Sequence, residues 1–153
     1  MPRAKPPAAA LLSSADDIEQ QFYEALQQGD LDMLMAVWAD DEEVVCVHPG
    51  GPRVIGPAAI RQSFEAIFAN GPIPVVPDQV HRVHGAGCAV HHLAERVSIH
   101  TEQGPRTAWV LATNVYLKTA HGWRMVAHHA SPGAVGAPED VTQAVGEPPS
   151  TLH

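Results

Sequence analysis

Apolar residues recur at helical spacing in three segments of the first half of the chain. The first lies between Ser14 and Gly29, the second runs from Asp30 to Trp38, and the third begins at Pro57. Serine and aspartate cap helix starts, glycine ends helices, and proline is favoured in the first turn, so each segment predicts a helix. The apolar stripes are Ile18, Phe22, Ala25 and Leu26; Leu31, Leu34, Met35 and Trp38; and Ile60, Phe64, Ile67 and Phe68.

The remaining apolar segments have the patterns of β-strands. The run "EVVCVH" (43–48) has no alternation, which predicts a strand buried on both faces, and "PGGPRVIG" then turns back through a short strand. Four longer strands are expected at 75–84, 88–100, 107–118 and 122–131. Helices followed by antiparallel hairpins predict the α+β class, with the helices on one face of a curved sheet.

One domain is expected to occupy most of the 153 residues. Residues 1–13 are rich in proline and alanine, and residues 133–153 mix prolines and glycines without a period. Both segments are typical of flexible termini. The ordered domain is therefore predicted to span residues 14–132, between a disordered N-terminal segment and a flexible C-terminal tail.

The charge of the chain disfavours two classes of partner. Its formal net charge is −8, and its nine basic residues do not cluster, whereas nucleic acids and anionic membranes are bound by clustered basic residues. No apolar stretch reaches spanning length, and the N-terminal apolar run is shorter than that of a signal peptide. We therefore expect a cytoplasmic protein. Its two cysteines, Cys46 and Cys88, are interpreted as buried free thiols.

Alternation along the strands sorts the residues that can carry chemistry. In 88–100 the more apolar face holds His91 and Glu95. A carboxylate facing the core costs several kcal/mol unless it is paired or protonated. Two interpretations stay open: a register shift or a strand end exposes Glu95, or Glu95 is a buried acid with a raised pKa or a histidine partner.

The last two strands each have two half-apolar faces. In 122–131, His129 shares a face with Met125, which predicts that His129 points to the core. In 107–118, Asn114 lies on one face and Leu111 on the other. A sheet with two apolar faces predicts helices on one side and another subunit on the other.

The chain has ten histidines, but their spacing does not form a chelate. Adjacent histidines at 91–92 and 128–129 point to opposite faces of a strand. A metal site would have to gather single histidines from separate strands, so hydration or hydrogen bonding is the default interpretation. That default applies to His81, His92, His100 and His121.

The run "FYEALQQGDLDMLMAVWADDEEVVCVHPGG", followed by "GPAAIRQSFEAIF", resembles the nuclear transport factor 2-like superfamily, which includes ketosteroid isomerase and the SnoaL-like polyketide cyclases. The "GDLD…WADD" helix junction, the "G-x-x-AI" helix start and the closing "GWRMVAHHASP" fit this group over about residues 15–131. The resemblance implies a cystatin-like cone, in which three N-terminal helices pack on a strongly curved, mostly antiparallel sheet around a pocket. It also implies a homodimer formed through the outer sheet face.

The resemblance to ketosteroid isomerase assigns roles to particular residues. With one residue of extra spacing, His48 before Pro49 takes the place of the general base, and Asn114 takes that of an oxyanion-hole acid. Phe22 stands in place of the oxyanion-hole tyrosine, with Tyr23 one residue off. Loss of that donor argues against steroid isomerisation and leaves proton abstraction next to a carbonyl. The alternatives are structural roles: His48 hydrogen-bonds to a backbone carbonyl, and the Asn114 amide forms a local hydrogen bond.

The first hypothesis is a SnoaL-like isomerase, cyclase or dehydratase that binds a small apolar or carbonyl-containing molecule. His48 is its expected base, Asn114 its oxyanion donor, and Glu95 and His129 its second polar pair. No organic cofactor is implied, because the chain has no glycine-rich phosphate loop. The alternatives are a non-catalytic binding or dimerisation module and, more weakly, a metal-binding cone using His48, His129 and Glu95. The expected pocket walls are Phe22, Trp38, Phe64, Phe68 and His91.

Overall fold

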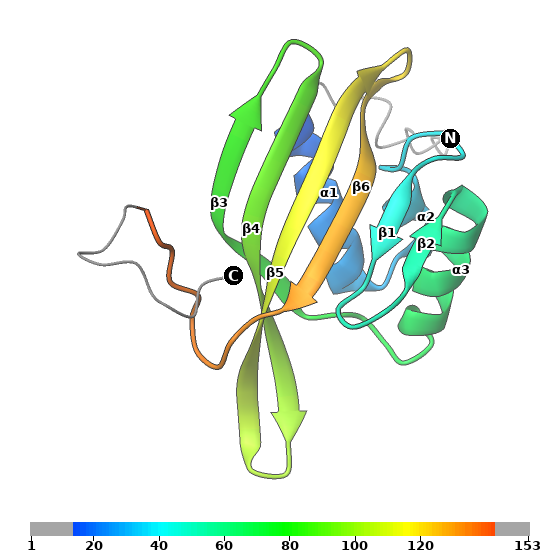
Figure 1. Cartoon of the computed structure of the whole chain (residues 1–153). Helices are drawn as coiled ribbons and strands as arrows, with labels where there is room; N and C mark the ends of the chain where they lie inside the picture. The colour runs from blue at the N-terminus through cyan, green and yellow to red at the C-terminus, as the bar shows by residue number, and fades with distance from the viewer. Residues whose placement is uncertain (1–13, 143–153) are drawn as a thin grey trace, which may run out of the picture.

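The computed structural model describes residues 14–142 and places three helices against one face of a six-stranded sheet (Figure 1). The predicted α+β class is confirmed. The elements are α1 (Ala15–Gln28), α2 (Leu31–Met35), β1 (Val45–Val47), β2 (Arg53–Ile55), α3 (Pro57–Phe68), β3 (Val75–His84), β4 (Cys88–Thr101), β5 (Gly104–Thr119) and β6 (Gly122–Pro132).

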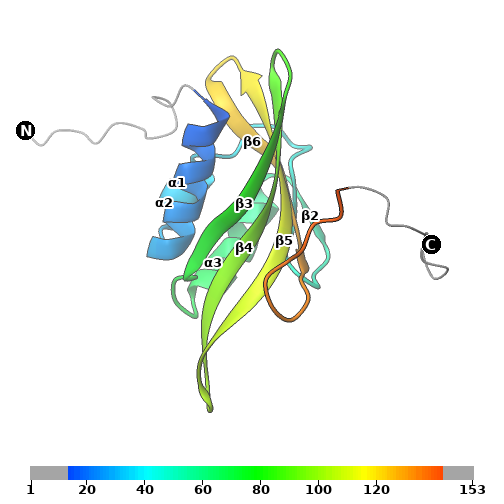
Figure 2. The ribbon, with the colours of Figure 1, turned by 90° about the vertical axis from the view of Figure 1, so that its left-hand side faces the viewer.

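The sheet order is β2-β1-β6-β5-β4-β3, with β1 parallel to β6 and every other neighbouring pair antiparallel. Figure 2 shows α1 and α2 on one side of the sheet and the segment after β6 on the other. The far end of the β4–β5 hairpin extends beyond the body of the sheet (Figure 1). We call the helix-covered side the inner face and the opposite side the outer face.

The helix boundaries follow the predicted caps. The Ser14 side chain accepts a hydrogen bond from the Asp17 amide at 3.1 Å, which satisfies one of the unpaired donors of a first turn. Gly29 ends α1 in the left-handed conformation, with φ 67°, where a glycine has no side chain to clash. Pro57 occupies the first turn of α3.

The core lies between α1 and the inner face of the sheet. Ile18 and Phe22 of the predicted stripe are fully buried, and Phe64 of α3 is 2 % exposed. Full burial of one large apolar side chain contributes about 1.5–3 kcal/mol, so these stripes hold the helices on the sheet. Tyr23, one residue beyond the stripe, is also buried.

A β-bulge overturns the prediction for the last strand. The register between β5 and β6 shifts after the pair Val115 and Ala127, so that Tyr116 pairs with Met125. The extra residue reverses the alternation within β6. His128 is therefore buried on the inner face, whereas His129 is exposed on the outer face. The expectation that His129 points to the core is wrong.

The outer face carries an apolar row that crosses all six strands. Each member is the register partner of the next, and we call this set the valine row: Val83, Val90, Val115, Ala127, Val45 and Ile55. None of its members is fully buried, and Val83 is 61 % exposed. Leu111 and Leu117 are also exposed on this face, as the alternation within β5 predicts.

The terminal segments are only partly described. Residues 1–13 and 143–153 lie outside the described residues, so their predicted flexibility stays a prediction. Residues 133–142 have no regular structure, and Asp140 lies 3.3 Å from His81 of β3 in an ion pair. In the described part, no helix is long and apolar enough to cross a membrane. Both cysteines are free thiols, and Cys46 is buried as predicted, whereas Cys88 is only partly buried.

Candidate functional site

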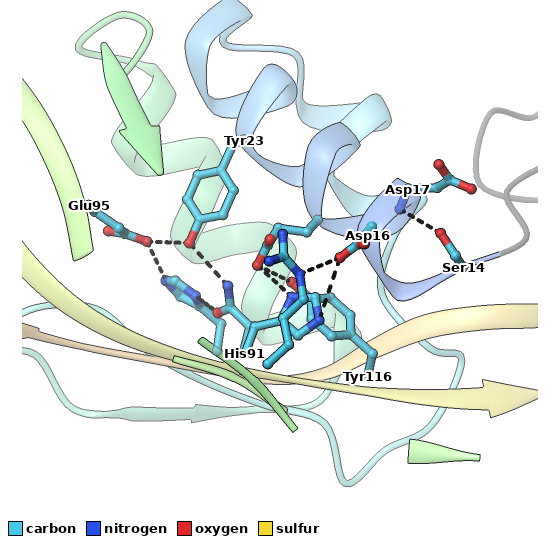
Figure 3. A network of polar contacts seen from close by, with 11 residues as sticks. Ser14, Asp16, Asp17, Tyr23, His91, Glu95 and Tyr116 are labelled. Atoms are coloured by element: carbon cyan, nitrogen blue, oxygen red, sulfur yellow. Dashed lines mark hydrogen bonds and ion pairs between the residues drawn. The ribbon is translucent and has the colours of Figure 1, made fainter. Parts of the chain in front are cut away.

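Four polar side chains form a buried hydrogen-bonded network between α1 and the sheet, which we call the Glu95 network. The Tyr23 hydroxyl donates to Glu95 Oε2 at 2.7 Å, and Asn114 Nδ2 donates to the Tyr23 oxygen at 3.0 Å. His128 Nδ1 lies 2.6 Å from Asn114 Oδ1, and its Nε2 lies 3.9 Å from Glu95 Oε2. Figure 3 shows the Tyr23 hydroxyl and the Glu95 carboxyl facing one another.

The hydrogen bonds of this network all run in one direction. Asn114 Oδ1 can only accept, so His128 Nδ1 carries a proton and donates it. Asn114 donates to Tyr23, and Tyr23 donates to Glu95. Hydrogen bonds in a chain polarise one another, so this arrangement stabilises negative charge at the Glu95 end.

Burial works against that negative charge. Glu95 is 6 % exposed, and burial raises its pKa to about 7, although the hydrogen bond from Tyr23 acts in the opposite direction. Burial lowers the pKa of His128 to about 3, and repulsion from His48 and His129 adds to the effect. His128 is therefore neutral at neutral pH, and Glu95 changes its charge there. Of the two open interpretations for Glu95, the structure supports the buried acid.

His48 lies just after β1, half-buried, beside this network. Ser63 donates its hydroxyl proton to the Ile60 carbonyl oxygen at 2.8 Å, so it accepts from His48 Nε2 at 3.0 Å. The alternative expectation was a hydrogen bond from His48 to a backbone carbonyl, whereas the observed partner is the Ser63 side chain. Cys46 Sγ is 3.9 Å from His48 Nε2, and burial lowers the pKa of His48.

Aromatic rings separate His48 from the Glu95 network. The centroid of the Phe64 ring is 4.8 Å from that of His48 and 6.3 Å from that of Phe22. Phe22 in turn lies 5.0 Å from the His128 ring. The Phe64 and Phe22 rings thus lie between the half-buried His48 and the buried Glu95 network, and we call these two rings the aromatic route. Phe68 packs beside Phe64 at 6.1 Å.

The other predicted site residues lie elsewhere. His91 is buried, but it belongs to a second polar cluster with Glu19 and Tyr116. Trp38 lines hollows at the edge of the sheet, beside Asp40. His129 lies on the outer face, so the sheet separates it from Glu95 and removes it from the predicted polar pair. The metal alternative that combined His48, His129 and Glu95 fails for the same reason.

The structure also brings in two residues that were not predicted for the site. Tyr23 is next to Phe22, the residue that the resemblance places at the oxyanion-hole tyrosine position. Its hydroxyl is nevertheless at the centre of the Glu95 network. The helical period could have identified it, because Tyr23 lies four residues after Glu19 and shares its buried face. His128 carried no such signal, because the bulge in β6 is not visible in the sequence.

Comparisons with known proteins agree with this architecture. The model of the SnoaL-like domain family matches residues 16–135. A solved structure described as a "putative calcium/calmodulin-dependent protein kinase type II association domain" from Thiobacillus denitrificans is 38 % identical. The match covers 80 % of this chain and 98 % of that one, with a TM-score of 0.73.

A "putative dehydratase from the NTF2-like family" from Streptomyces avermitilis is 30 % identical, over 76 % of this chain and 91 % of that one, with a TM-score of 0.68. A solved structure described as "S. rosetta CaMKII hub" shares the fold, at 22 % identity and a TM-score of 0.62, over 86 % of this chain and 99 % of that one. The comparison with curated proteins found no match. The chain belongs to the SnoaL-like domain family, within the nuclear transport factor 2-like superfamily.

Proposed function

We propose that the chain binds a small, largely apolar molecule with a carbonyl group inside the cone and moves a proton at the carbon next to that group. Glu95 is the proposed acid–base residue. The proposal rests on the environment of Glu95, which is 6 % exposed and has a carboxyl pKa of about 7. A proton acceptor with a pKa near the working pH combines adequate basicity with adequate ionisation.

The rest of the Glu95 network supplies donors for the oxygen of such a ligand. Burial raises the pKa of Tyr23 well above its ordinary value, so its hydroxyl keeps its proton. It donates that proton to Glu95 in this structure and bonds a ligand oxygen only by turning away from Glu95. The Asn114 amide is a donor that does not titrate. Donors held in a buried site stabilise the negative charge that develops on a carbonyl oxygen when a neighbouring proton leaves.

His48 has a supporting role in the proposal. His48 is half-buried at the solvent end of the aromatic route. A ligand that enters by displacing the Phe64 and Phe22 rings therefore passes the His48 ring. Since burial lowers its pKa, its ring is neutral at neutral pH and can accept a proton at Nδ1. The similarity to a protein described as a dehydratase supports chemistry of this type.

The test is hydrogen exchange in D₂O. Untagged protein is incubated with small cyclic and aromatic ketones, and deuterium incorporation next to the carbonyl is followed by NMR. We expect faster exchange in at least one ketone, and a loss of about 100-fold or more in Glu95→Gln. Glu65→Gln, which changes an exposed glutamate of α3, is the matched control. A ketone that binds in the cone without exchange, or exchange unchanged by Glu95→Gln, contradicts the proposal.

A second candidate function is self-association through the outer face. The valine row gives this face an apolar strip across all six strands, flanked by exposed Leu111 and Leu117. A contiguous exposed apolar patch is a feature of protein interaction sites. The similarity to a protein described as an association domain favours a second copy of the chain as the occupant.

A further inference from the structure

A second polar cluster lies at the start of α1, beside the Glu95 network, since Tyr116 interacts with both Glu19 and Asn114. Asp16 and Glu19 are in the first turns of α1, and His91 faces them from β4. Figure 3 shows Asp16, His91 and Tyr116 together at this place. One candidate ligand atom from each of Asp16, Glu19 and His91 lies within 4.8 Å of the other two.

The two ring nitrogens of His91 have different surroundings. Nδ1 is 2.9 Å from Glu19 Oε2, and a carboxylate only accepts, so Nδ1 carries a proton. Nε2 is fully buried and has no hydrogen-bond partner in the described part of the chain. In a neutral ring Nε2 therefore presents a lone pair, and a buried lone pair without a donor is unfavourable.

The surroundings of the Nε2 lone pair suit a bound cation. Nε2 lies 3.8 Å from Asp16 Oδ1, which is beyond hydrogen-bond range. Two ligand atoms that share one ion at about 2.0–2.2 Å lie about 3.3–3.6 Å apart in a tetrahedral site and at most about 4.4 Å apart. A lone pair and a carboxylate oxygen at 3.8 Å are therefore placed as two ligands of one ion.

Glu19 has the position of an orienting residue. Metal-binding histidines usually donate their other ring proton to a carboxylate, which fixes the tautomer and the ring plane. Glu19 accepts that proton from His91, and the Tyr116 hydroxyl holds the same Glu19 oxygen at 3.3 Å. The ring of His91 is thus held with Nε2 directed at Asp16.

His84 can supply a third ligand from the exposed side of Asp16. Its exposed ring, at the end of β3, is 6.0 Å from the His91 ring between centroids. The ring has to turn to bring a nitrogen to the ion, because the ligand atoms that already lie together belong to Asp16, Glu19 and His91. Arg82 binds Asp16 Oδ1 at 2.8 Å, but both side chains are about half exposed. Exposed ion pairs of this kind are weak, so a divalent ion can displace Arg82.

We propose that His91 Nε2, the Asp16 carboxylate and His84 bind one divalent transition-metal ion such as Zn²⁺, with Glu19 orienting His91. Imidazole and carboxylate ligands together suit Zn²⁺ and Co²⁺ rather than Mg²⁺ or Ca²⁺, which take oxygen ligands. The site uses none of the residues to which the proposed function assigns a role.

The test is calorimetric titration of the untagged full chain with ZnCl₂, CoCl₂ and MgCl₂. We expect one Zn²⁺ per chain, a Co²⁺ complex with visible absorption, and no binding of Mg²⁺. Asp16→Asn and His84→Gln alter exposed side chains, so the fold survives, and each should weaken Zn²⁺ binding at least tenfold. Glu19→Gln should weaken it by about 10- to 100-fold.

The matched control is His81→Gln, because His81 is an exposed histidine with an acidic partner, Asp140, on the outer face. It should leave Zn²⁺ affinity unchanged. Absence of Zn²⁺ binding overturns the proposal. So does binding that survives Asp16→Asn and His84→Gln, or that is lost in His81→Gln.

Discussion

The Tyr23 hydroxyl donates a 2.7 Å hydrogen bond to Glu95 across the space between α1 and β4. This contact joins two positions 72 residues apart and ties a helix to the centre of a strand. Within residues 14–142 this hydroxyl is the direct donor to the buried carboxyl, and the nearby His128 is neutral at neutral pH because its pKa is about 3. The pH dependence of stability should therefore report the state of the site.

The first prediction concerns Glu95→Gln. Glu95 has a folded-state pKa of about 7 against an ordinary value near 4.3. In the unfolded chain it ionises first, so its contribution disfavours the folded state increasingly from about pH 4.5 to 7. The cost approaches about 4 kcal/mol above pH 7. Glutamine keeps an acceptor for Tyr23, so the variant should be the more stable protein at pH 8 by urea denaturation. Equal stability of both proteins at pH 8 would count against a buried neutral acid.

His128→Gln should change the pH dependence in the opposite sense. The folded-state pKa of His128 is about 3, below its ordinary value, so its contribution is present above pH 6.5 and is lost as the pH falls toward 3. Between pH 4.5 and 6.5 this slope offsets that of Glu95. His128→Gln should therefore gain stability on acidification from pH 7 to 4.5, whereas Glu95→Gln should lose it. Parallel pH profiles for the two variants would contradict this assignment.

Tyr23→Phe should destabilise the fold and shift the Glu95 titration. Removing the hydroxyl leaves Glu95 Oε2 and Asn114 Nδ2 without their partner, at a cost of about 1–3 kcal/mol. Because the Tyr23 hydrogen bond lowers the pKa of Glu95, that pKa should rise further in the variant. Carboxyl ¹³C NMR measures the shift. Glu65→Gln, which changes an exposed glutamate of α3, should leave the Glu95 titration in place.

His48→Ala should cost little stability. His48 is half-buried, and its side-chain polar contacts are with Ser63 and, at 3.9 Å, with the Cys46 sulfur, so its loss leaves a partly solvated space rather than a packed void. We expect a loss below about 3 kcal/mol, the scale of a truncated core residue, in urea denaturation. A larger loss would show that His48 is a structural residue rather than part of the route to the site.

Leu111→Arg should weaken self-association. Leu111 is 46 % exposed on the outer face, and a charge there opposes burial against a second apolar face. Analytical ultracentrifugation should show a shift toward monomer. Gln62→Arg adds the same charge to an exposed position of α3 on the opposite side and should leave the profile unchanged. An unaltered Leu111→Arg profile would remove the outer face as the interface.

The sequence pattern predicted the fold better than the site. Caps at Ser14, Gly29 and Pro57 act locally, and the helical stripes have a fixed period, so the three helices follow from short segments. The placement of Asn114 and Glu95 follows from simple alternation in two long strands. His129 was misplaced because one bulge residue in β6 reverses the alternation, and that bulge depends on pairing with β5.

Tyr23 and His128 show what alternation cannot predict. Their importance comes from partners on distant elements: Tyr23 reaches β4 and β5, and His128 reaches Asn114 across two paired strands. Similarly, the shifted pKa of Glu95 depends on how deeply three separate elements bury it. Such quantities exist only once the chain has folded.

The most direct test of the account is the pKa of Glu95 in the folded protein, measured by ¹³C NMR of the carboxyl carbon with Glu95→Gln to assign the signal. The account predicts a midpoint near pH 7. A midpoint near the ordinary value of about 4.3 would mean that Glu95 is a solvated carboxylate, and would contradict its proposed role as the acid–base residue of the cone.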